Sequence, residues 1–170
     1  MIRYVSISLT CLVFLTLISC ASKDMRSQIV ERDNTKMLYG SISKEQLYFD
    51  YPSWRAEEDS YRTFEPAIQE LSTLSKKISI EIFIGTWCSD SEREVPRFFR
   101  VIEDAGIARL LSIDLWAVDR KKTMDNNLAQ LRNIERVPTF IFYRDNQEIG
   151  RIIESPDELL EQDMVLILKE

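Results

Sequence analysis

Cys88 is the residue whose type and position in this sequence best suit chemistry. It follows an apolar, largely β-branched run, residues 78–84, and a break at Gly85-Thr86, and it precedes a segment rich in charged, helix-favouring residues. This order predicts a strand, a short turn and a helix, with the cysteine at the turn. The first turn of a helix carries unpaired N–H groups and the positive end of the helix dipole, so a thiolate can be stabilised there. The pattern favours a reactive cysteine, while an inert, half-buried thiol fits the same position.

The composition excludes several classes of function. The 170 residues include no histidine, which removes His-based triads, histidine general bases and the commonest metal ligand. The chain has 28 acidic against 22 basic residues, a net charge of −6, and it lacks a basic run of the kind that follows phosphates. We therefore expect one globular domain that does not bind nucleic acid.

The N-terminus has the pattern of an export signal. A charged start, Met1-Ile2-Arg3, precedes an apolar stretch from Tyr4 to Ile18 that is too short for a comfortable membrane span. Its end, Leu17-Ile18-Ser19-Cys20, resembles a bacterial lipoprotein signal, which implies that residues 1–19 are removed and that Cys20 is lipidated. Ordinary cleavage near Ala21 and an uncleaved anchor are the alternatives. We expect an exported protein held by lipid in the cell membrane or outer membrane, with its domain in the periplasm or on the cell surface.

This processing would leave Cys88 as the only free thiol. Cys11 would depart with the signal and Cys20 would become a thioether, so no intramolecular disulfide could form in the oxidising compartment. One thiol without histidine cannot assemble a soft-ligand metal site. We therefore expect neither a metal nor another cofactor.

The remaining chain predicts an α/β domain. Residues 20–44 are polar and are interpreted as a tether, and residues 45–170 as the domain. The aromatic stretch Leu47 to Trp54 is expected to dock as an irregular arm, although a ligand surface is an alternative. The expected elements are a helix carrying Tyr61, Phe64, Ile68, Leu71 and Leu74, kinked or begun by Pro66; the strand at 78–84; a helix ending at Ala105-Gly106; a strand from Leu110 to Val118; a short helix with Leu128 and Leu131; a hairpin of strands at 140–143 and 148–153; and a last helix from Ser155. This order predicts a mixed sheet with helices on both faces.

Three motifs in this order resemble the thioredoxin family. They are Trp87-Cys88-Ser89-Asp90-Ser91 between strand and helix, Pro96 eight residues after the cysteine, and Val137-Pro138-Thr139 before the hairpin. The resemblance covers Tyr61 to the C-terminus and implies a thioredoxin-like three-layer α/β/α sandwich with a mixed central sheet. It assigns Cys88 as the attacking cysteine, Trp87 and the Val137-Pro138 backbone to substrate binding, Pro96 to a helix kink, and Pro138 to a cis-proline loop facing the cysteine.

The sequence departs from this family at three places. Ser91 stands where the second, resolving cysteine is expected, so one chain cannot complete a dithiol cycle. Ile82 replaces the buried acid that often lies beneath that second cysteine. Three acids at the helix start, Asp90, Glu92 and Glu94, stabilise the helix but compete with a thiolate for the same positive potential. Arg93 and Arg97 are expected to oppose them in part.

Two functional hypotheses follow. In the first, Cys88 forms a mixed disulfide with a cysteine-containing or extended polypeptide, Ser91 donates a hydrogen bond to the thiolate, and an external thiol reductant resolves the intermediate. In the second, the domain is a redox-inert peptide-binding or chaperone-like module. Several residues also have purely structural interpretations: Trp87 as packing, Ser91 as a helix cap, Asp119 as a turn residue, and Trp116 and Tyr143 as sheet or core residues.

Overall fold

The computed structural model describes residues 28–32 and 34–169. The predicted signal peptide, Cys20 and the first part of the predicted tether lie outside the described residues. Within them the strands are β1 (Gln28–Arg32), β2 (Thr35–Ile42), β3 (Ile78–Ile84), β4 (Leu111–Ala117), β5 (Thr139–Arg144) and β6 (Gln147–Ile153). The helices are α1 (Lys44–Asp50), α2 (Pro52–Ser60), α3 (Glu65–Leu71), α4 (Ser89–Ala105), α5 (Leu128–Leu131) and α6 (Leu160–Leu168), with a 3-10 turn at Ala108–Leu110.

Strand β3 lies inside a mixed sheet with the order β1-β2-β4-β3-β5-β6. It pairs in parallel with β4 and antiparallel with β5, and β5 and β6 form the predicted hairpin. The predicted strand at residues 78–84 is confirmed at both ends. Its β-branched residues suit a strand that is covered on both faces, because successive side chains point to opposite sides of a sheet. Ile80 and Ile82 enter one apolar cluster and Phe83 enters another.

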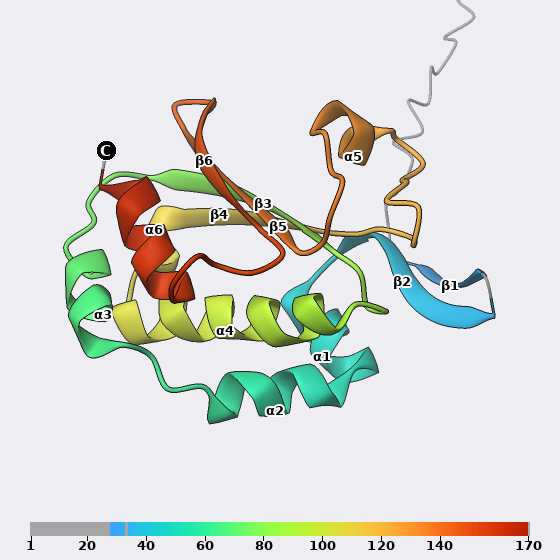
Figure 1. Ribbon diagram of the computed structural model, residues 1–170, viewed down its shortest axis with the longest axis horizontal. Helices are drawn as coiled ribbons and strands as arrows, with labels where there is room; N and C mark the ends of the chain where they lie inside the picture. The colour runs from blue at the N-terminus through green and yellow to red at the C-terminus, as the bar shows by residue number, and fades with distance from the viewer. Residues whose placement is uncertain (1–27, 33, 170) are drawn as a thin grey trace, which may run out of the picture.

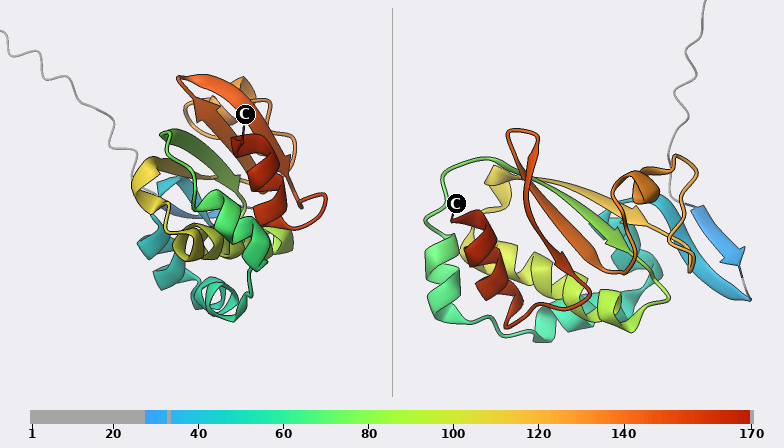
Figure 2. Two further views of the ribbon diagram at one scale, coloured as in Figure 1. Left: turned by 90° about the vertical axis from the view of Figure 1, so that its left-hand side faces the viewer. Right: turned by 45° about the horizontal axis from the view of Figure 1, so that its top comes forward.

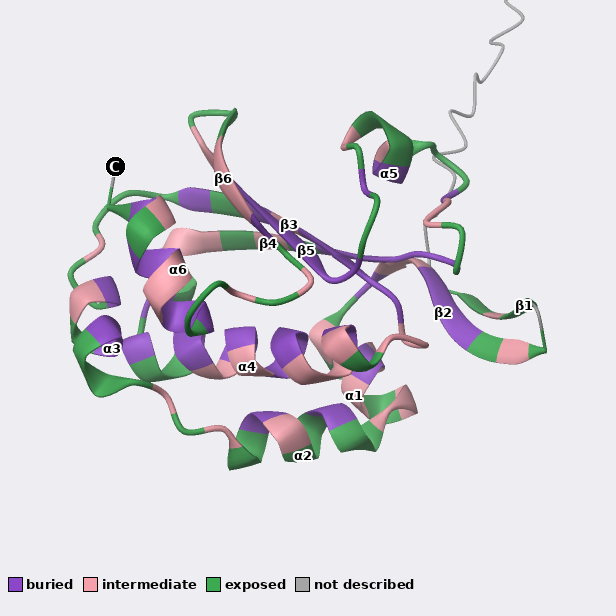
Figure 3. Cartoon of the chain, in the orientation of Figure 1, coloured by how far each residue is buried: buried purple, intermediate pink, exposed green. Residues whose placement is uncertain are grey.

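Helices cover the two faces of the sheet unequally. Helices α1 to α4 and α6 lie on one side and α5 lies on the other, as Figures 1 and 2 show. The larger side holds the main core, where Phe98 of α4 contacts the rings of Phe140 and Phe142 of β5. The smaller side buries Phe83 and Trp116 in a second cluster with Ala129 of α5. Figure 3 shows buried segments on the central strands of the sheet and along α4. The predicted α/β class with helices on both faces of a mixed sheet is confirmed.

Helix α4 begins directly after Cys88 and ends at Ala105, with Gly106 as its C-cap. Gly106 adopts a left-handed conformation with φ of 66°, which glycine accepts without steric cost, so the predicted end of this helix is confirmed. The buried face of the helix includes Val95 and Phe98. Pro96 is also buried inside the helix, and because proline has no N–H, it cannot bond to the Glu92 carbonyl one turn earlier.

The predicted tether over residues 20–44 is wrong for the part that the structure describes. β1 and β2 form an antiparallel hairpin, and β2 pairs with β4 through the register Gly40↔Ala117. Met37 and Leu38 are fully buried. Most residues of this segment are polar, so its composition resembles that of a linker and the few apolar residues do not indicate a strand. The segment forms a strand because its backbone groups pair with β4. The folded unit therefore includes β1 and β2 and does not begin at residue 45.

Three helix predictions need correction. The stretch from Leu47 to Trp54 is not an irregular arm but covers the end of α1 and the start of α2, with Tyr51 between them. Trp54 is docked as expected, with only 1% of its surface exposed. The next helix starts at Glu65, so Tyr61 and Phe64 precede it; Pro66 fits the first turn, whereas inside a helix its ring would clash with the preceding turn. The last helix starts at Leu160, and Ser155 accepts a hydrogen bond from Arg93 instead of capping it.

None of the helices in residues 28–32 and 34–169 combines the length and apolar character needed to cross a bilayer.

The docking of α2 predicts a large effect of Trp54 on stability. Trp54→Ala should lower the free energy of unfolding by about 3–5 kcal/mol, because it removes a large buried side chain and leaves a cavity. Phe49 on α1 is 84% exposed, so Phe49→Ala should change this free energy by less than about 0.5 kcal/mol. Urea unfolding of the two variants measures both values. Equal effects would show that α2 does not dock as described.

Candidate functional site

The turn between β3 and α4 is closed by its own hydrogen bonds. The Cys88 N–H donates to the Gly85 carbonyl at 2.9 Å, and the Gly85 N–H donates to the Ser91 hydroxyl at 3.2 Å. From outside the turn, the Leu38 N–H of β2 donates to the Thr86 hydroxyl at 3.1 Å. Cys88 is therefore held at the helix start by local bonds and by a neighbouring strand.

Trp87 packs over the backbone of this turn. A side-chain carbon added at Gly85 would lie 2.6 Å from the nearest atom of the Trp87 ring, so glycine is required for this approach. The indole N–H donates to the Val118 carbonyl at 3.0 Å, at the end of β4. Trp87 thus packs against the turn and bonds the chain after β4, and its role in substrate binding stays a prediction.

The Cys88 thiol faces the loop that precedes β5. Its sulfur donates to the Val137 carbonyl at 3.2 Å, and the side chain is half-buried. The Val137-Pro138 peptide bond is cis, as the family resemblance implied. The structure thus brings Cys88 and Val137-Pro138 together, as predicted.

Ser91 is the third residue of α4 and is fully buried. Cys88, and not Ser91, occupies the N-cap position, so the interpretation of Ser91 as the helix cap is wrong. The serine oxygen accepts from the Gly85 N–H, which gives Ser91 a structural function in shaping the turn. Donation by the same hydroxyl to a Cys88 thiolate stays a prediction.

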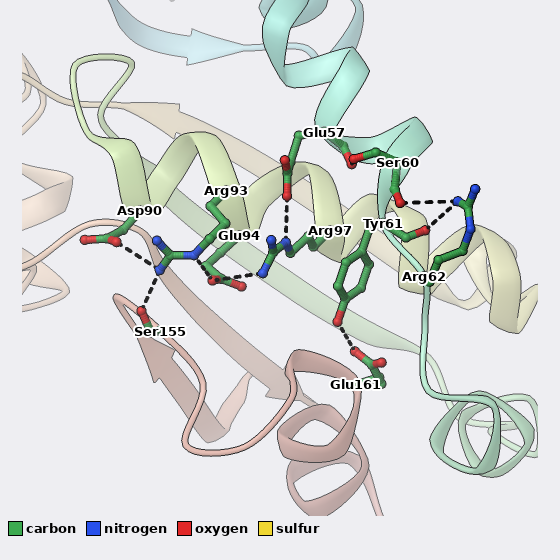
Figure 4. Close-up of polar contacts among 10 residues, drawn as sticks. All are labelled: Glu57, Ser60, Tyr61, Arg62, Asp90, Arg93, Glu94, Arg97, Ser155 and Glu161. Carbon is green, nitrogen blue, oxygen red and sulfur yellow. Dashed lines mark hydrogen bonds and ion pairs between the residues drawn. The ribbon is translucent and has the colours of Figure 1, made fainter.

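The acids at the start of α4 all have partners. Arg93 bonds Asp90 at 2.9 Å and the buried Glu94 at 2.6 Å, and Ser53 donates to Glu92 at 2.6 Å. Figure 4 shows this chain of contacts continuing along the helix through Arg97, whose other partner is Glu57 of α2. The expected opposition of the acids by Arg93 and Arg97 is confirmed.

The strand beneath the site supplies no free acid. Ile82 is fully buried in the main core. Its neighbour Glu81 accepts two bonds from Arg132, at 2.5 and 2.9 Å, and one from the Tyr143 hydroxyl at 2.8 Å. Burial raises the pKa of Glu81, but these donors outweigh it and leave the pKa below its ordinary value. The carboxylate therefore stays charged and engaged with Arg132 and Tyr143.

Asp119 organises the loop after β4, which lies beside Trp87. Its side chain is nearly buried and accepts from the N–H groups of Lys121 and Thr123, from the Thr123 hydroxyl, and from Arg32 of β1. Burial raises the pKa of the Asp119 carboxyl, but the donors on Thr123 and Arg32 outweigh it, so this pKa lies below its ordinary value. The turn interpretation of Asp119 is confirmed.

The sequence reasoning missed the basic residues of this loop. The Arg120 guanidinium lies 5.0 Å from the centroid of the Trp87 ring, and the Lys122 ammonium lies 5.8 Å from it. The run Arg120-Lys121-Lys122 is visible in the sequence and could have indicated a charged surface, but its position beside Trp87 depends on the fold. Among the described residues, no group of three or more potential metal ligands is gathered closely enough to hold an ion.

Comparisons with known proteins support the fold. No protein-family model matches the sequence. The chain is 26% identical over 91 residues, which are 54% of its length and 67% of the relative, to a protein of Nicotiana tabacum described as thioredoxin H-type 1. A crystal structure of a Pseudomonas aeruginosa protein of unknown function shares 12% identity and superposes with a TM-score of 0.56 over 75% of this chain and 86% of its own. An HIV epitope scaffold gives 12% identity and a TM-score of 0.50 over 74% and 76%. With the mixed sheet and the placement of Cys88, these findings identify a thioredoxin-like α/β fold.

Asp119 gives a prediction for pH-dependent stability. Asp119→Asn should lower the free energy of unfolding at pH 7 by about 1–3 kcal/mol, because the charged acceptor of several hydrogen bonds is lost. The pKa of Asp119 is depressed in the folded state, so its contribution is complete above the unfolded pKa of about 3.9 and is lost as the pH falls through the folded value. Urea unfolding from pH 7 to pH 3 should show wild type and variant converging.

The control is Asp157→Asn, which changes an exposed carboxylate. It should follow wild type at every pH, and a constant gap between Asp119→Asn and wild type down to pH 3 would contradict the assigned role.

Proposed function

We propose that this protein carries out thiol-disulfide exchange through the single thiol of Cys88. The placement of Cys88 is the observation that supports the proposal: a half-buried thiol at the N-cap of a 17-residue helix, opposite the Val137 carbonyl, in a thioredoxin-like fold. The helix start offers unpaired N–H groups and a positive dipole to a thiolate. The loop before β5 offers backbone beside the sulfur where an extended substrate could pair.

The proposed reaction is an exchange in which sulfur bonds are conserved. The Cys88 thiol loses its proton to water or buffer, and the thiolate attacks one sulfur of a substrate disulfide. A new bond forms between Cys88 and that sulfur, the substrate S–S bond breaks, and the other sulfur leaves as a thiolate that takes up a proton. A second, external thiol then attacks the mixed disulfide by the same chemistry, which regenerates Cys88 and leaves the substrate sulfur bonded to the external thiol.

The proposed roles of the other residues follow this cycle. Ser91 donates a hydrogen bond from its hydroxyl to the Cys88 thiolate while its oxygen keeps the bond from the Gly85 N–H. Trp87 and the backbone of Val137-Pro138 hold the substrate chain. The substrates are cysteine-containing or extended polypeptides, and the resolving partner is an external thiol. Lipidation at Cys20 would anchor the domain in the cell envelope, where disulfides persist.

A redox-inert peptide-binding module is the second candidate function. The bond from the Cys88 sulfur to the Val137 carbonyl favours it, because this contact engages the thiol and occupies a backbone acceptor beside the site. Reaction rates of Cys88 therefore distinguish the two candidates.

The proposal predicts that the folded site accelerates exchange. In a full chain with Cys11→Ser and Cys20→Ser, Cys88 should take up one glutathionyl group from oxidised glutathione, as measured by intact mass. The rate constant should exceed that of the same chain unfolded in urea by roughly tenfold or more, because the folded chain holds the attacking sulfur at the start of α4 beside the substrate-binding backbone. Adding Cys88→Ser should abolish the product. Equal or slower reaction of the folded chain would favour the inert module.

The position of Ser91 predicts that a second thiol can be restored. In the same background, Ser91→Cys should form an internal disulfide with Cys88 on oxidation, with loss of two hydrogens from the mass. Residues three apart at a helix start have Cβ atoms about 5–6 Å apart, which a disulfide can bridge with small adjustments. Ser89→Cys is the control, because neighbouring residues point apart and should give the mixed disulfide. Failure of Ser91→Cys to close would contradict the geometry of the turn.

A further inference from the structure

The loop of residues 119–123 presents three consecutive cations beside Trp87, the residue that precedes Cys88. Arg120 and Lys121 are exposed and Lys122 is half-buried. Arg120 and Lys122 both lie over the Trp87 ring. Within the part of the chain that the structure describes, no ion pair joins these three side chains to a carboxylate. This is unusual for a chain of net charge −6, in which acids are abundant.

The acids close to this loop are engaged elsewhere. Asp119 accepts bonds from its own loop and from Arg32, and Asp125 accepts from the Tyr39 hydroxyl at 3.1 Å. These bonds tie the neighbouring carboxylates to other donors. Arg32 offsets the charge of Asp119, and the three cations outnumber the remaining carboxylate of Asp125, which leaves a local excess of positive charge beside Trp87.

The loop is also held in one conformation. The Asp119 carboxylate accepts from the N–H groups of Lys121 and Thr123 at 3.0 and 2.8 Å, and the Lys122 N–H donates to the Asp119 carbonyl at 2.9 Å. Arg32 of β1 ties the same carboxylate to the edge of the sheet at 2.6 Å. Because the loop is already ordered, a partner that binds these charges does so with little loss of conformational entropy from the loop.

We propose that the loop of residues 119–123 is a docking surface for an acidic polypeptide segment that flanks the sulfur attacked by Cys88. This inference rests on the proposed thiol exchange at Cys88 and adds the charge of its substrates. Unpaired cations favour acidic partners by charge complementarity and speed their association. The contacts with the Trp87 ring hold two of the cations beside the residue that precedes Cys88.

The test measures binding apart from reaction. The full chain carrying Cys11→Ser, Cys20→Ser and Cys88→Ser is titrated against three fluorescent ten-residue peptides without cysteine, which contain four Asp, four Lys or four Ser. At low ionic strength the Asp peptide should bind at least about tenfold more tightly than the Ser peptide, and the preference should fall as salt is added. Adding Arg120→Gln, Lys121→Gln and Lys122→Gln should remove the preference.

A matched control distinguishes the effect of this surface on binding from the effect of the net charge of the protein. Lys76→Gln, Lys77→Gln and Arg109→Gln remove the same charge, but these exposed residues precede β3 and β4, about 20 Å from Cys88 along the strand. The control should keep the preference for the Asp peptide. Equal binding of the three peptides, or equal losses in the two triple variants, would overturn the proposal. Binding to vesicles of anionic lipid in place of the Asp peptide would also overturn it, because a membrane would then be the occupant.

A second arm tests the proposed function by itself. The same peptides, each with one cysteine joined to 2-thiopyridine, are mixed with the chain that retains Cys88, and release of the thione is followed by absorbance. The Asp peptide should react about tenfold faster than the Ser peptide. If the rate of release is the same with Cys88 as with Cys88→Ser for all three peptides, thiol exchange is contradicted. The binding result would still decide whether the loop binds acidic chains.

Discussion

The hydrogen bond from the Cys88 thiol to the Val137 carbonyl joins two loops that are 49 residues apart in the chain. The sheet makes this contact possible. β3 and β4 run in parallel and finish at the same end of the sheet. The antiparallel β5 begins at that end, with Phe83 opposite Thr139. The turn bearing Cys88, the loop after β4 and the loop before β5 therefore meet at one end of the sheet, and every proposed feature of the site depends on that meeting.

The N-terminal hairpin supports the same end of the sheet. From β1 and β2, Leu38 bonds Thr86 in the cysteine turn, Arg32 bonds Asp119, and Tyr39 bonds Asp125. The hairpin thus holds both loops that flank Trp87. Its residues are not themselves reactive, but they fix the orientation of the groups that are proposed to bind substrate.

The sequence predicted the centre of the molecule better than its periphery. The sequence alone was sufficient to predict the strand at 78–84, the end of α4 before Gly106, and the hairpin of β5 and β6. Runs of β-branched residues and a single glycine determine these features locally. β2 was mistaken for tether because its strand depends on pairing with β4. Cys88 and Val137-Pro138 were found through a family pattern, whereas the partners of Asp119 and the placement of Arg120 and Lys122 over Trp87 arise only from tertiary contacts.

The central claim is that Cys88 forms mixed disulfides with other polypeptides in the cell. The most direct measurement is to block free thiols rapidly in intact cells that express either wild type or Cys88→Ser, and to identify by mass spectrometry the peptides disulfide-linked to residues 85–91. The account predicts adducts that disappear under reduction, that are absent from Cys88→Ser, and whose partner peptides are acidic. Finding Cys88 entirely as free thiol under oxidising growth conditions would contradict it.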